Sequence, residues 1–549
     1  MGKNYWIMNR RKNKLVLLAS AVLIFLSTTA YKTDYFEIAK QIEIYTTIFK
    51  EINMNYVDVT NPAKLMQTGL NSMLLGLDPY TTYLSEQDVE TARMNQSESF
   101  VGVGARVTRS QDRLIVTEVF EGLPANKKGV RVGDEIIKID GNKVSGLKDV
   151  ALQLLRGKKN SDVSLLILSN GVEKEISMKR AGMKPKAIPI VRLLDDGVGY
   201  IALDRFSKTS SKEVENALKL LIIDEAKGVI LDLRNNPGGL LQEAIKIVNL
   251  FVPKGQLVVS TKSNIEGYNQ VFVTTKEPVS LEVPLVVLIN ERSASASEIV
   301  AGALQDLDRA VVLGKRSFGK GLVQKPIPLP YGGQLKVTIS RYFTPSGRCI
   351  QAIDYAKRGE NGVANKQQKK DYKAFKTKNG RTVFDGGGVS PDVATENKKS
   401  SDFIEDLVKS DLIFDFANNY SHNNSIDSVK DFKLSNEEFN AFKELVYKSP
   451  LFLKDKSLLY LEEFSEVLKK EGLLGLDKKM NELKKGINKS KALSIVNFKK
   501  EITSVLEREI IRRFFYRKGV YEYYLLKNKE VIMAQELLNN TDQYLDIIN

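Results

Sequence analysis

The chain has 549 residues, of which 42% are hydrophobic and 27% are charged. This length allows several domains, and the composition is typical of globular proteins rather than disordered ones. The formal net charge is +15, but the densest basic segment, residues 351–381, also holds several glycine, asparagine and glutamine residues. That segment therefore predicts a solvated loop rather than a nucleic-acid groove, and no nucleic-acid partner is expected.

The chain contains one cysteine, Cys349, and one histidine, His422. These counts exclude an internal disulfide and a zinc site built from histidine and cysteine, and we predict neither a metal nor a cofactor. A Ser–His–Asp triad would have to use His422, which lies in the polar stretch 418–424 and is predicted to be in a loop. A serine nucleophile in this chain would therefore need a base other than histidine.

The first 30 residues are typical of an exported protein. Five basic residues within the first 14 are followed by the apolar run 15–26 and the small residues 27–30, which is the pattern of a secretory signal. The apolar run is short for a membrane span, but residues 15–30 can also remain as a signal anchor. We therefore expect export to the periplasm or cell envelope, with cleavage or inner-membrane anchoring left open.

Residues 31–96 predict an N-terminal helical region, and residues 97–182 have a different pattern. Here a glycine-rich entry segment precedes alternating strands, a helix at 147–155 and a closing strand pair. This order resembles a PDZ domain, which implies that backbone N–H groups of the entry loop hold the C-terminal carboxylate of a peptide. The implied peptide-binding residues are Val101, Gly102, Val103 and Gly104, with Arg156 as a candidate sensor near the groove.

Residues 183–397 alternate strands with helices, which predicts an α/β core. The buried strand 228–233 ends in a turn that contains Gly238, and the apolar strand 284–289 ends in small residues around Ser295. Each turn precedes a helix, so free backbone N–H groups lie at the helix start, as a nucleophile with an anion site requires. Ser295 and Glu298 also have the spacing of a capping box, so this stretch alone leaves open a simple helix cap.

Lys320 lies among glycines and apolar residues rather than in a charged run. If residues 320–324 form one strand, Lys320 and Gln324 share a face, because they are an even number apart, and the Gln324 amide can hold the lysine amine. A lysine acts as a general base only when it is neutral, which requires its pKa to fall from about 10.4 to about 7. Residues 398–549 are predicted to be helical and contain no catalytic motif.

Ser295, Lys320, Gln324 and the Gly238 turn, together with the PDZ pattern, resemble the carboxyl-terminal processing peptidases, also called tail-specific proteases. The resemblance covers residues 34–395. It implies an α/β, multidomain protein: a mixed α/β protease core with an inserted PDZ domain, an N-terminal helical cap and a C-terminal helical region. It also implies Ser295 as nucleophile, Lys320 as base and Gln324 as its partner. The implied oxyanion donors are the N–H of Ala296 and one in the turn at Gly238, and Asp306 is implied as structural support.

The resulting hypothesis is an exported serine endopeptidase. It would bind proteins with exposed apolar C-termini through the PDZ domain and cleave them through a Ser/Lys acyl-enzyme. The alternative is a non-catalytic PDZ scaffold of the cell envelope that only binds tails, and the presence of all the dyad residues argues against it. A trypsin-like PDZ protease is excluded because the chain lacks a usable histidine. Homodimerisation and the role of residues 398–549 are left open.

Overall fold

The structure is a computed structural model that describes residues 32–89, 100–110, 113–145, 150–183, 186–358, 364–395, 402–453, 456–473 and 475–549. The predicted signal segment, residues 1–30, lies outside these ranges. The chain divides into two compact units, one formed by residues up to Glu86 together with Pro326–Val337 and the other by the remainder. In the part of the chain that the structure describes, no helix combines the length and the apolar character needed to cross a bilayer.

The first unit contains two helices of the predicted N-terminal helical region. They are α2 (Lys32–Asn55) and α3 (Pro62–Leu75). The Asn61 side chain accepts the N–H of Lys64 at 3.0 Å, so it caps α3 in the usual way. The strand β1 (Thr82–Leu84) pairs antiparallel with the first residues of β18 (Gln334–Phe343).

The PDZ-like part is an antiparallel sheet with the strand order β3-β4-β5-β7-β8 and with β6 beside β5. Its strands are β3 (Ala105–Ser110), β4 (Arg113–Val119), β5 (Glu135–Ile139), β6 (Asn142–Lys143), β7 (Asp162–Ser169) and β8 (Val172–Lys179). A separate pair, β2 (Phe100–Gly102) and β9 (Ala181–Met183), joins the two ends of the segment. The short helices are α5 (Pro124–Lys127) and α6 (Val150–Leu154), and residues 147–149 of the predicted groove helix lie outside the described ranges.

The predicted peptidase core is a six-stranded sheet with the order β10-β11-β12-β15-β16-β23. Its strands are β10 (Ile190–Leu193), β11 (Val198–Ala202), β12 (Gly228–Asp232), β15 (Leu285–Ile289), β16 (Val311–Gly314) and β23 (Val393–Ala394). All neighbouring strands are parallel except β10, which runs antiparallel to β11. One face packs against α7 (Ser210–Ile223), α8 (Leu241–Val248) and α9 (Ala296–Asp306). The inner strands β11, β12, β15 and β16 are buried along their whole length because both faces of the sheet are covered.

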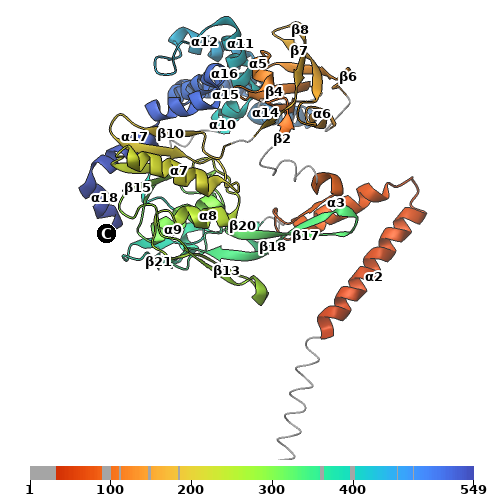
Figure 1. Cartoon of the computed structure of the whole chain (residues 1–549). Coiled ribbons are helices and arrows are strands. Elements are labelled where there is room, and N and C mark those ends of the chain that lie inside the picture. The colour runs from red at the N-terminus through yellow and green to blue at the C-terminus, as the bar shows by residue number, and fades with distance from the viewer. Residues whose placement is uncertain are drawn as a thin grey trace, which may run out of the picture. The chain divides into compact units, whose positions relative to one another are not determined.

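The last two helices of the chain cover the other face of this sheet. They are α17 (Lys529–Asn539) and α18 (Thr541–Ile548), which lie beside β15 in Figure 1. Leu537, Leu538 and Tyr544 share one buried cluster with Val286 and Leu288 of the central strand. The end of the chain is therefore part of the peptidase core, although its sequence predicts only another helical segment.

Smaller strands and turns complete the core. They are β13 (Leu257–Lys262), β14 (Gln270–Val273), β17 (Leu322–Pro328), β19 (Ile353–Arg358), β20 (Ala364–Lys366), β21 (Ala374–Lys376) and β22 (Thr382–Phe384), with the short helices η1 (Glu266–Tyr268), η2 (Pro330–Gly332) and η3 (Lys369–Asp371). Strand β18 pairs through its last residues with β13 and also pairs with β17.

A helical domain with its own core lies between β23 and α17 in sequence. Its helices are α10 (Asp402–Lys409), α11 (Asp411–Asn423), α12 (Asn436–Lys448), α13 (Pro450–Leu453), α14 (Lys456–Lys470), α15 (Asp477–Asn497) and α16 (Lys499–Lys527). His422 lies in the last turn of α11, so the predicted loop at 418–424 is wrong. The helix forms there because its apolar face, with Phe416 and Ala417, packs into this core.

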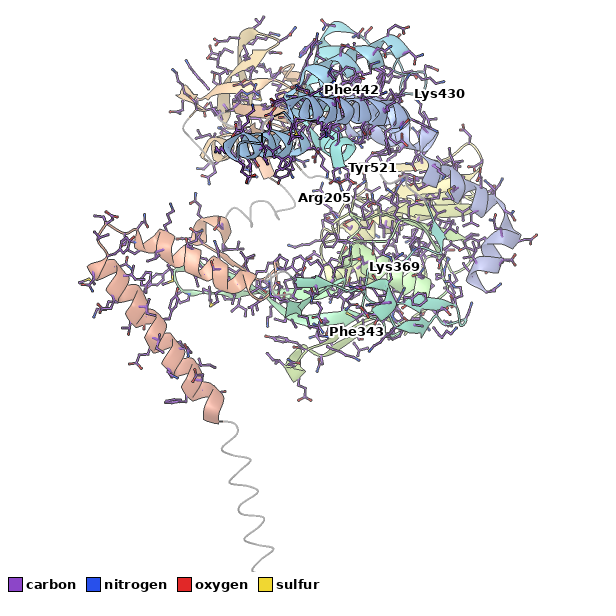
Figure 2. All side chains as sticks on the ribbon, turned by 180° about the vertical axis from the view of Figure 1, so that it is seen from behind. Arg205, Phe343, Lys369, Lys430, Phe442 and Tyr521 are labelled. Carbon is purple, nitrogen blue, oxygen red and sulfur yellow. The ribbon has the colours of Figure 1, made fainter. Side chains whose placement is uncertain are left out.

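Helix α16 bends at Tyr516, whose φ is 54° and ψ −156°. At the bend, the Asn126 amide of the PDZ domain donates a hydrogen bond to the Tyr516 hydroxyl at 2.5 Å. Beyond the bend, Tyr521 donates to the carboxylate of Asp204 in the peptidase core, and Figure 2 shows Tyr521 close to Arg205 at this junction. One helix therefore contacts both the PDZ domain and the core.

Candidate active site

Ser295 lies directly before α9 in a strained backbone conformation. Its φ is 56° and its ψ −112°, and a non-glycine residue in such a region costs of the order of 1–3 kcal/mol. The turn follows β15, as the sequence predicts, and the Ser295 side chain is partly exposed. A strained strand–turn–helix junction of this kind presents a side chain at the carboxyl edge of a parallel sheet.

The carboxylate of Glu298 joins the serine turn to the lysine loop. Its Oε2 atom accepts the N–H of Ser295 at 2.8 Å and the N–H of Lys320 at 2.9 Å. Its Oε1 atom accepts the Ser317 hydroxyl at 2.5 Å and the N–H of Gly319 at 2.7 Å. Two backbone N–H groups that donate hydrogen bonds to the same oxygen atom must lie close together. The structure therefore brings the backbones of Ser295 and Lys320 side by side.

Glu298 is fully buried, and this burial raises the pKa of its carboxyl group, against the opposing effect of the hydrogen bonds that it accepts. The predicted capping relation with Ser295 is present, since Glu298 holds the serine N–H and its own N–H donates to the Ser295 carbonyl at 2.9 Å. The sequence predicts Glu298 only as part of the helix cap. The Ser-x-x-Glu spacing was the available signal, but it does not reveal the bonds to the lysine loop.

Lys320 lies in a loop that ends before β17, so the prediction of one strand through residues 320–324 is wrong. The cause is close packing of the two flanking glycines. A Cβ on Gly319 would lie 2.4 Å from that of Ala352, and a Cβ on Gly321 would lie 2.9 Å from the backbone nitrogen of Gln351. The Gly321 N–H also donates to Gln351 Oε1 at 2.7 Å, so this N–H is not available to a neighbouring strand.

Gln324 lies in β17, and its Nε2 atom donates to the Thr338 hydroxyl at 3.3 Å. The expected contact between the Gln324 amide and the Lys320 amine stays a prediction. Because Lys320 precedes the strand, the argument from a shared strand face no longer supports that contact.

The Gly238 turn lies directly against the serine. A Cβ on Gly238 would lie 2.7 Å from the Ala294 carbonyl oxygen and 2.9 Å from the Ala296 nitrogen. The Ala296 N–H, at the first residue of α9, has no acceptor among the residues described here, whereas the Gly238 N–H donates to Asn236 Oδ1 at 2.9 Å. Ala296 therefore has the geometry of an available oxyanion donor. In this conformation Gly238 lets its turn approach the backbone around Ser295 closely, but its own N–H is already hydrogen-bonded. Its role as an oxyanion donor stays a prediction.

The predicted PDZ residues come together at the start of that domain. Gly102 forms a backbone bridge with Arg156 next to the end of α6. Val103 is buried in the domain core, and its carbonyl accepts the N–H of Ala125 at 2.8 Å. The entry loop is therefore fixed beside the predicted groove, while the peptide-binding roles of Val101 to Gly104 and of Arg156 stay predictions.

A buried ion pair supports the site from behind. Asp306, the last residue of α9, pairs with Arg348 at 2.7 Å, and both side chains are fully buried. Asp306 also accepts the N–H of Ser346 at 3.0 Å. This network fixes the segment that leads to Gln351, which in turn holds Gly321 beside the lysine. The arrangement fits the structural role implied for Asp306.

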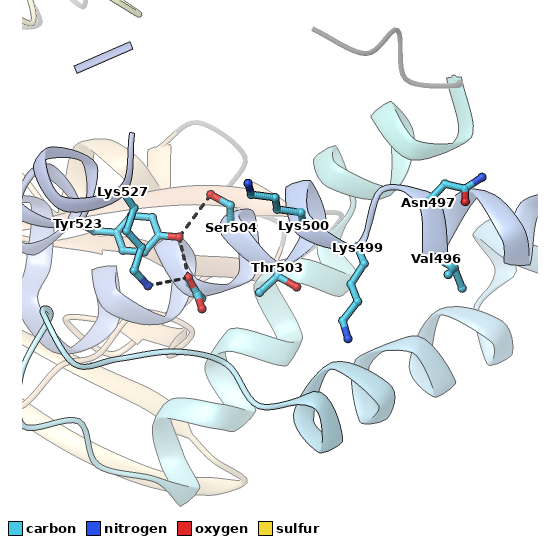
Figure 3. Close-up of a pocket in the computed structure, with 9 residues that line it drawn as sticks. Val496, Asn497, Lys499, Lys500, Thr503, Ser504, Tyr523 and Lys527 are labelled. Atoms are coloured by element: carbon cyan, nitrogen blue, oxygen red, sulfur yellow. Dashed lines mark hydrogen bonds and ion pairs between the residues drawn. The ribbon is translucent and has the colours of Figure 1, made fainter. Parts of the chain in front are cut away.

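A cleft of about 510 Å³ lies in the helical domain, between the end of α15 and α16. Its buried carboxylate, Glu507, already accepts the Tyr523 hydroxyl at 2.7 Å and the Lys527 amine at 3.2 Å. Figure 3 shows Lys499 and Lys500 pointing away from each other rather than toward a common ligand. In the described ranges, no cluster of histidine, cysteine, aspartate and glutamate is arranged to hold a metal ion.

Comparison with known proteins assigns these features to a family. The model for "Peptidase family S41" matches residues 197–357, and the PDZ domain model matches residues 101–179. The carboxy-terminal-processing protease of Bartonella bacilliformis is 37% identical over 341 residues, which cover 61% of this chain and 78% of that protein. The chain belongs to the carboxy-terminal-processing protease family. It is a serine-type peptidase with a PDZ domain, so the predicted family, fold class and enzyme class are confirmed.

Further matches extend the likeness. A probable CtpA-like serine protease of Staphylococcus aureus is 34% identical over 307 residues, which cover 55% of this chain and 61% of that protein. The solved photosystem II D1 C-terminal processing protease is 24% identical and covers 64% of this chain and 92% of its own, with a TM-score of 0.35. A model described as "Probable PDZ-protease, C-terminal helical domain" matches residues 403–538, outside the region of the sequence resemblance.

Proposed function

We propose that this peptidase is an exported serine endopeptidase that recognises protein C-terminal tails through its PDZ domain and cleaves with a Ser295/Lys320 dyad. The observation that carries the proposal is the shared bonding of the Ser295 and Lys320 N–H groups to one oxygen of the buried Glu298. Such preorganised positioning of a nucleophile and a base is what an acyl-transfer site requires.

The reaction proceeds in two halves. The neutral Lys320 amine takes the proton of the Ser295 hydroxyl as the serine oxygen attacks the peptide carbonyl. The Ala296 N–H at the start of α9 stabilises the oxyanion, helped by the positive end of the helix dipole. The lysine then protonates the leaving amine, and the same residue activates the water that hydrolyses the acyl-enzyme. Gln324 is the proposed partner that orients the amine.

The dyad is tested by the substitutions Ser295→Ala and Lys320→Ala, with an unfolded protein that has an apolar C-terminus as substrate. Each variant is expected to cleave about a thousandfold more slowly or worse, because dyad members act as a unit. Cleavage at the parental rate would refute the assignment. If the parent also fails to cleave but binds the tail, the non-catalytic scaffold is the better reading.

Tail recognition is tested on the same substrate with its C-terminal carboxylate converted to an amide. The amide is expected to be cleaved more slowly, because the entry loop Val101–Gly104 would lose the charged group that its N–H groups hold. Equal rates for the acid and the amide would argue against carboxylate recognition by the PDZ domain.

The proposed location is the periplasm or cell envelope, and the support is the basic, apolar and small-residue order of residues 1–30. Fractionation combined with mass measurement of the mature N-terminus distinguishes a cleaved signal from an inner-membrane anchor. The proposed domain division is residues 31–96, 97–182, 183–397 and 398–549, with α17 and α18 of the last region packed on the core sheet.

A homodimer is the proposed assembly. The apolar residues of α2 include Ile38, Ile42, Tyr45, Phe49 and Ile52 at alternating spacings of four and three, the spacing of a helix–helix seam. Most of these side chains are exposed in the single chain. Sedimentation of the parent and of Ile42→Glu tests the proposal, and a parent that is monomeric at high concentration would contradict it.

A further inference from the structure

Tyr342 in β18 contacts both members of the proposed dyad through their backbones. Its hydroxyl oxygen lies 2.8 Å from the carbonyl oxygen of Lys320 and 3.2 Å from that of Ser295. Its own N–H donates to the carbonyl of Gly321 at 3.0 Å. No step of the proposed mechanism uses this side chain, so its two contacts require another explanation.

The contacts of Tyr342 complement those of Glu298. Glu298 accepts the N–H groups of Ser295 and Lys320, and Tyr342 donates toward the carbonyl groups of the same two residues. A tyrosine hydroxyl has only one proton to donate, so the two contacts form a bifurcated hydrogen bond. The shorter contact, to the Lys320 carbonyl, is the stronger component, and the contact to the Ser295 carbonyl is the weaker one. The backbones of Ser295 and Lys320 are therefore held together twice, through their N–H groups by a carboxylate and through their carbonyl groups by a phenol.

The phenol is suited to this task because it cannot easily move or ionise. Its ring is buried in the main core cluster of the peptidase sheet, and the Tyr342 backbone pairs with Thr261 of β13. Burial, followed by the nearby Glu298 charge, raises the pKa of the Tyr342 hydroxyl well above its usual value. The group therefore stays a hydrogen-bond donor across the working pH range.

We propose that Tyr342 is a positioning residue that holds Ser295 and Lys320 at their reactive separation through their carbonyl groups, an inference that rests on the proposed dyad. The need for such a tie follows from the strained φ of Ser295, since a turn that stores strain relaxes when a contact that holds it is removed. Tyr342 does not touch the reacting atoms, so its loss affects the chemical step through the geometry of the dyad.

The test is the substitution Tyr342→Phe, which removes one oxygen atom and keeps the buried ring. We expect kcat to fall by about ten- to a hundredfold, as displacements near 1 Å do, while KM stays within about twofold. The rate at which a small fluorophosphonate labels Ser295 should fall by a similar factor, because the probe needs the same activated serine but no PDZ contact.

Tyr544→Phe is the matched control. The Tyr544 hydroxyl also bridges two backbone groups, since it accepts the Leu285 N–H at 2.9 Å and lies 3.2 Å from the Leu285 carbonyl. The control therefore also loses a buried tyrosine-to-backbone hydrogen bond, here to β15, without touching Ser295 or Lys320. It should keep the parental kcat even if its melting temperature falls as far as that of Tyr342→Phe.

A third variant, with p-aminophenylalanine at position 342, restores a donor at the same place on the ring. The kcat of the p-aminophenylalanine variant should exceed that of Tyr342→Phe. If Tyr342→Phe does not fold, the kcat of the p-aminophenylalanine variant is compared with that of the parent instead. The inference is overturned if Tyr342→Phe keeps kcat and labelling within twofold of the parent, if the control loses as much kcat, or if the amine gives no recovery. Failure of the dyad itself appears separately, as parental cleavage by Ser295→Ala and Lys320→Ala.

Discussion

At the scale of single residues, Gly238 shows how little space separates the two turns of the site. A Cβ there would come within 3 Å of the Ser295 Cβ and of the Ala294 and Ala296 backbones, at a φ of 98°. Gly255 has a similar φ of 85°, but a Cβ there meets nothing within 4 Å. Alanine substitutions at the two glycines therefore distinguish the cost of backbone strain from the cost of steric contact.

Gly238→Ala should therefore lose activity far beyond Gly255→Ala. Both variants carry the cost of a left-handed alanine, about 1–2 kcal/mol, but only Gly238→Ala must displace the serine turn, which should lower kcat about a hundredfold. The measurements are kcat and the melting temperature. Equal kcat in the two variants would mean that the turn is not fitted against Ser295.

Glu298 provides the second prediction at this scale. In Glu298→Gln, an amide NH2 would face N–H donors, so at least one buried donor loses its partner, at a cost of about 1–3 kcal/mol. We also expect a large fall in kcat, because the backbone N–H groups of Ser295 and Lys320 lose the carboxylate oxygen that both donate to.

The control for Glu298→Gln is Glu243→Gln. Glu243 is also buried, and its carboxylate accepts the Ser211 N–H at 2.8 Å and the Lys246 amine at 2.7 Å, with no contact to the dyad. It should lose stability and keep kcat. Parental kcat in Glu298→Gln would show that the carboxylate is only a helix cap.

At the scale of elements, α17 and α18 are as much a part of the peptidase as the helices on the opposite face. Leu538 is buried on the sheet next to Gly228. A Cβ added to Gly228 would lie 2.8 Å from the Cδ2 atom of Leu538. Leu538→Ala should cost about 2–5 kcal/mol and lower the melting temperature of the core. Ile532 lies on the exposed side of the same helix, so Ile532→Ala should change stability by less than about 0.5 kcal/mol. Equal melting temperatures for the two variants would contradict this packing.

Sequence patterns predict many of these elements well and others poorly, for a physical reason. Strand β15, helix α9 and the turn at Ser295 follow from a continuous apolar run, a helical period and small residues, which are local properties. The loop at Lys320 is decided by close packing of Gly319 and Gly321 on Gln351 and Ala352, about 30 residues away. No local pattern contains that contact. The same limit applies to the role of Tyr342 and to the face covered by α17.

At the scale of the whole molecule, the helical domain connects the PDZ domain to the peptidase core. Phe414 of α11 packs against the PDZ core cluster, and the Arg513 guanidinium lies 4.7 Å from the Phe414 ring centre and donates to its carbonyl at 3.0 Å. Figure 1 shows α11 and α16 beside the PDZ elements α5 and β4. Burial in this contact lowers the pKa of Arg513 to about 10.

Phe414→Asp should release the PDZ domain from this helical surface, because it places a charge against an apolar cluster. The measurement is hydrogen–deuterium exchange, which should become faster in α11 and in the PDZ strands that face it. Lys430→Asp changes an exposed position of the same domain and should leave exchange unchanged. Unchanged exchange in Phe414→Asp would mean that Phe414 does not hold the two domains together.

In the proposed mechanism, one serine is activated by one lysine beside a buried carboxylate that both backbones share. The most direct measurement is the mass of the intact protein and its peptides after reaction with a fluorophosphonate. We expect a single adduct on Ser295 in the parent and about a thousandfold slower labelling in Lys320→Ala, since removal of the base leaves the serine hydroxyl protonated. Labelling at another residue, or parental labelling of Lys320→Ala, would contradict the account.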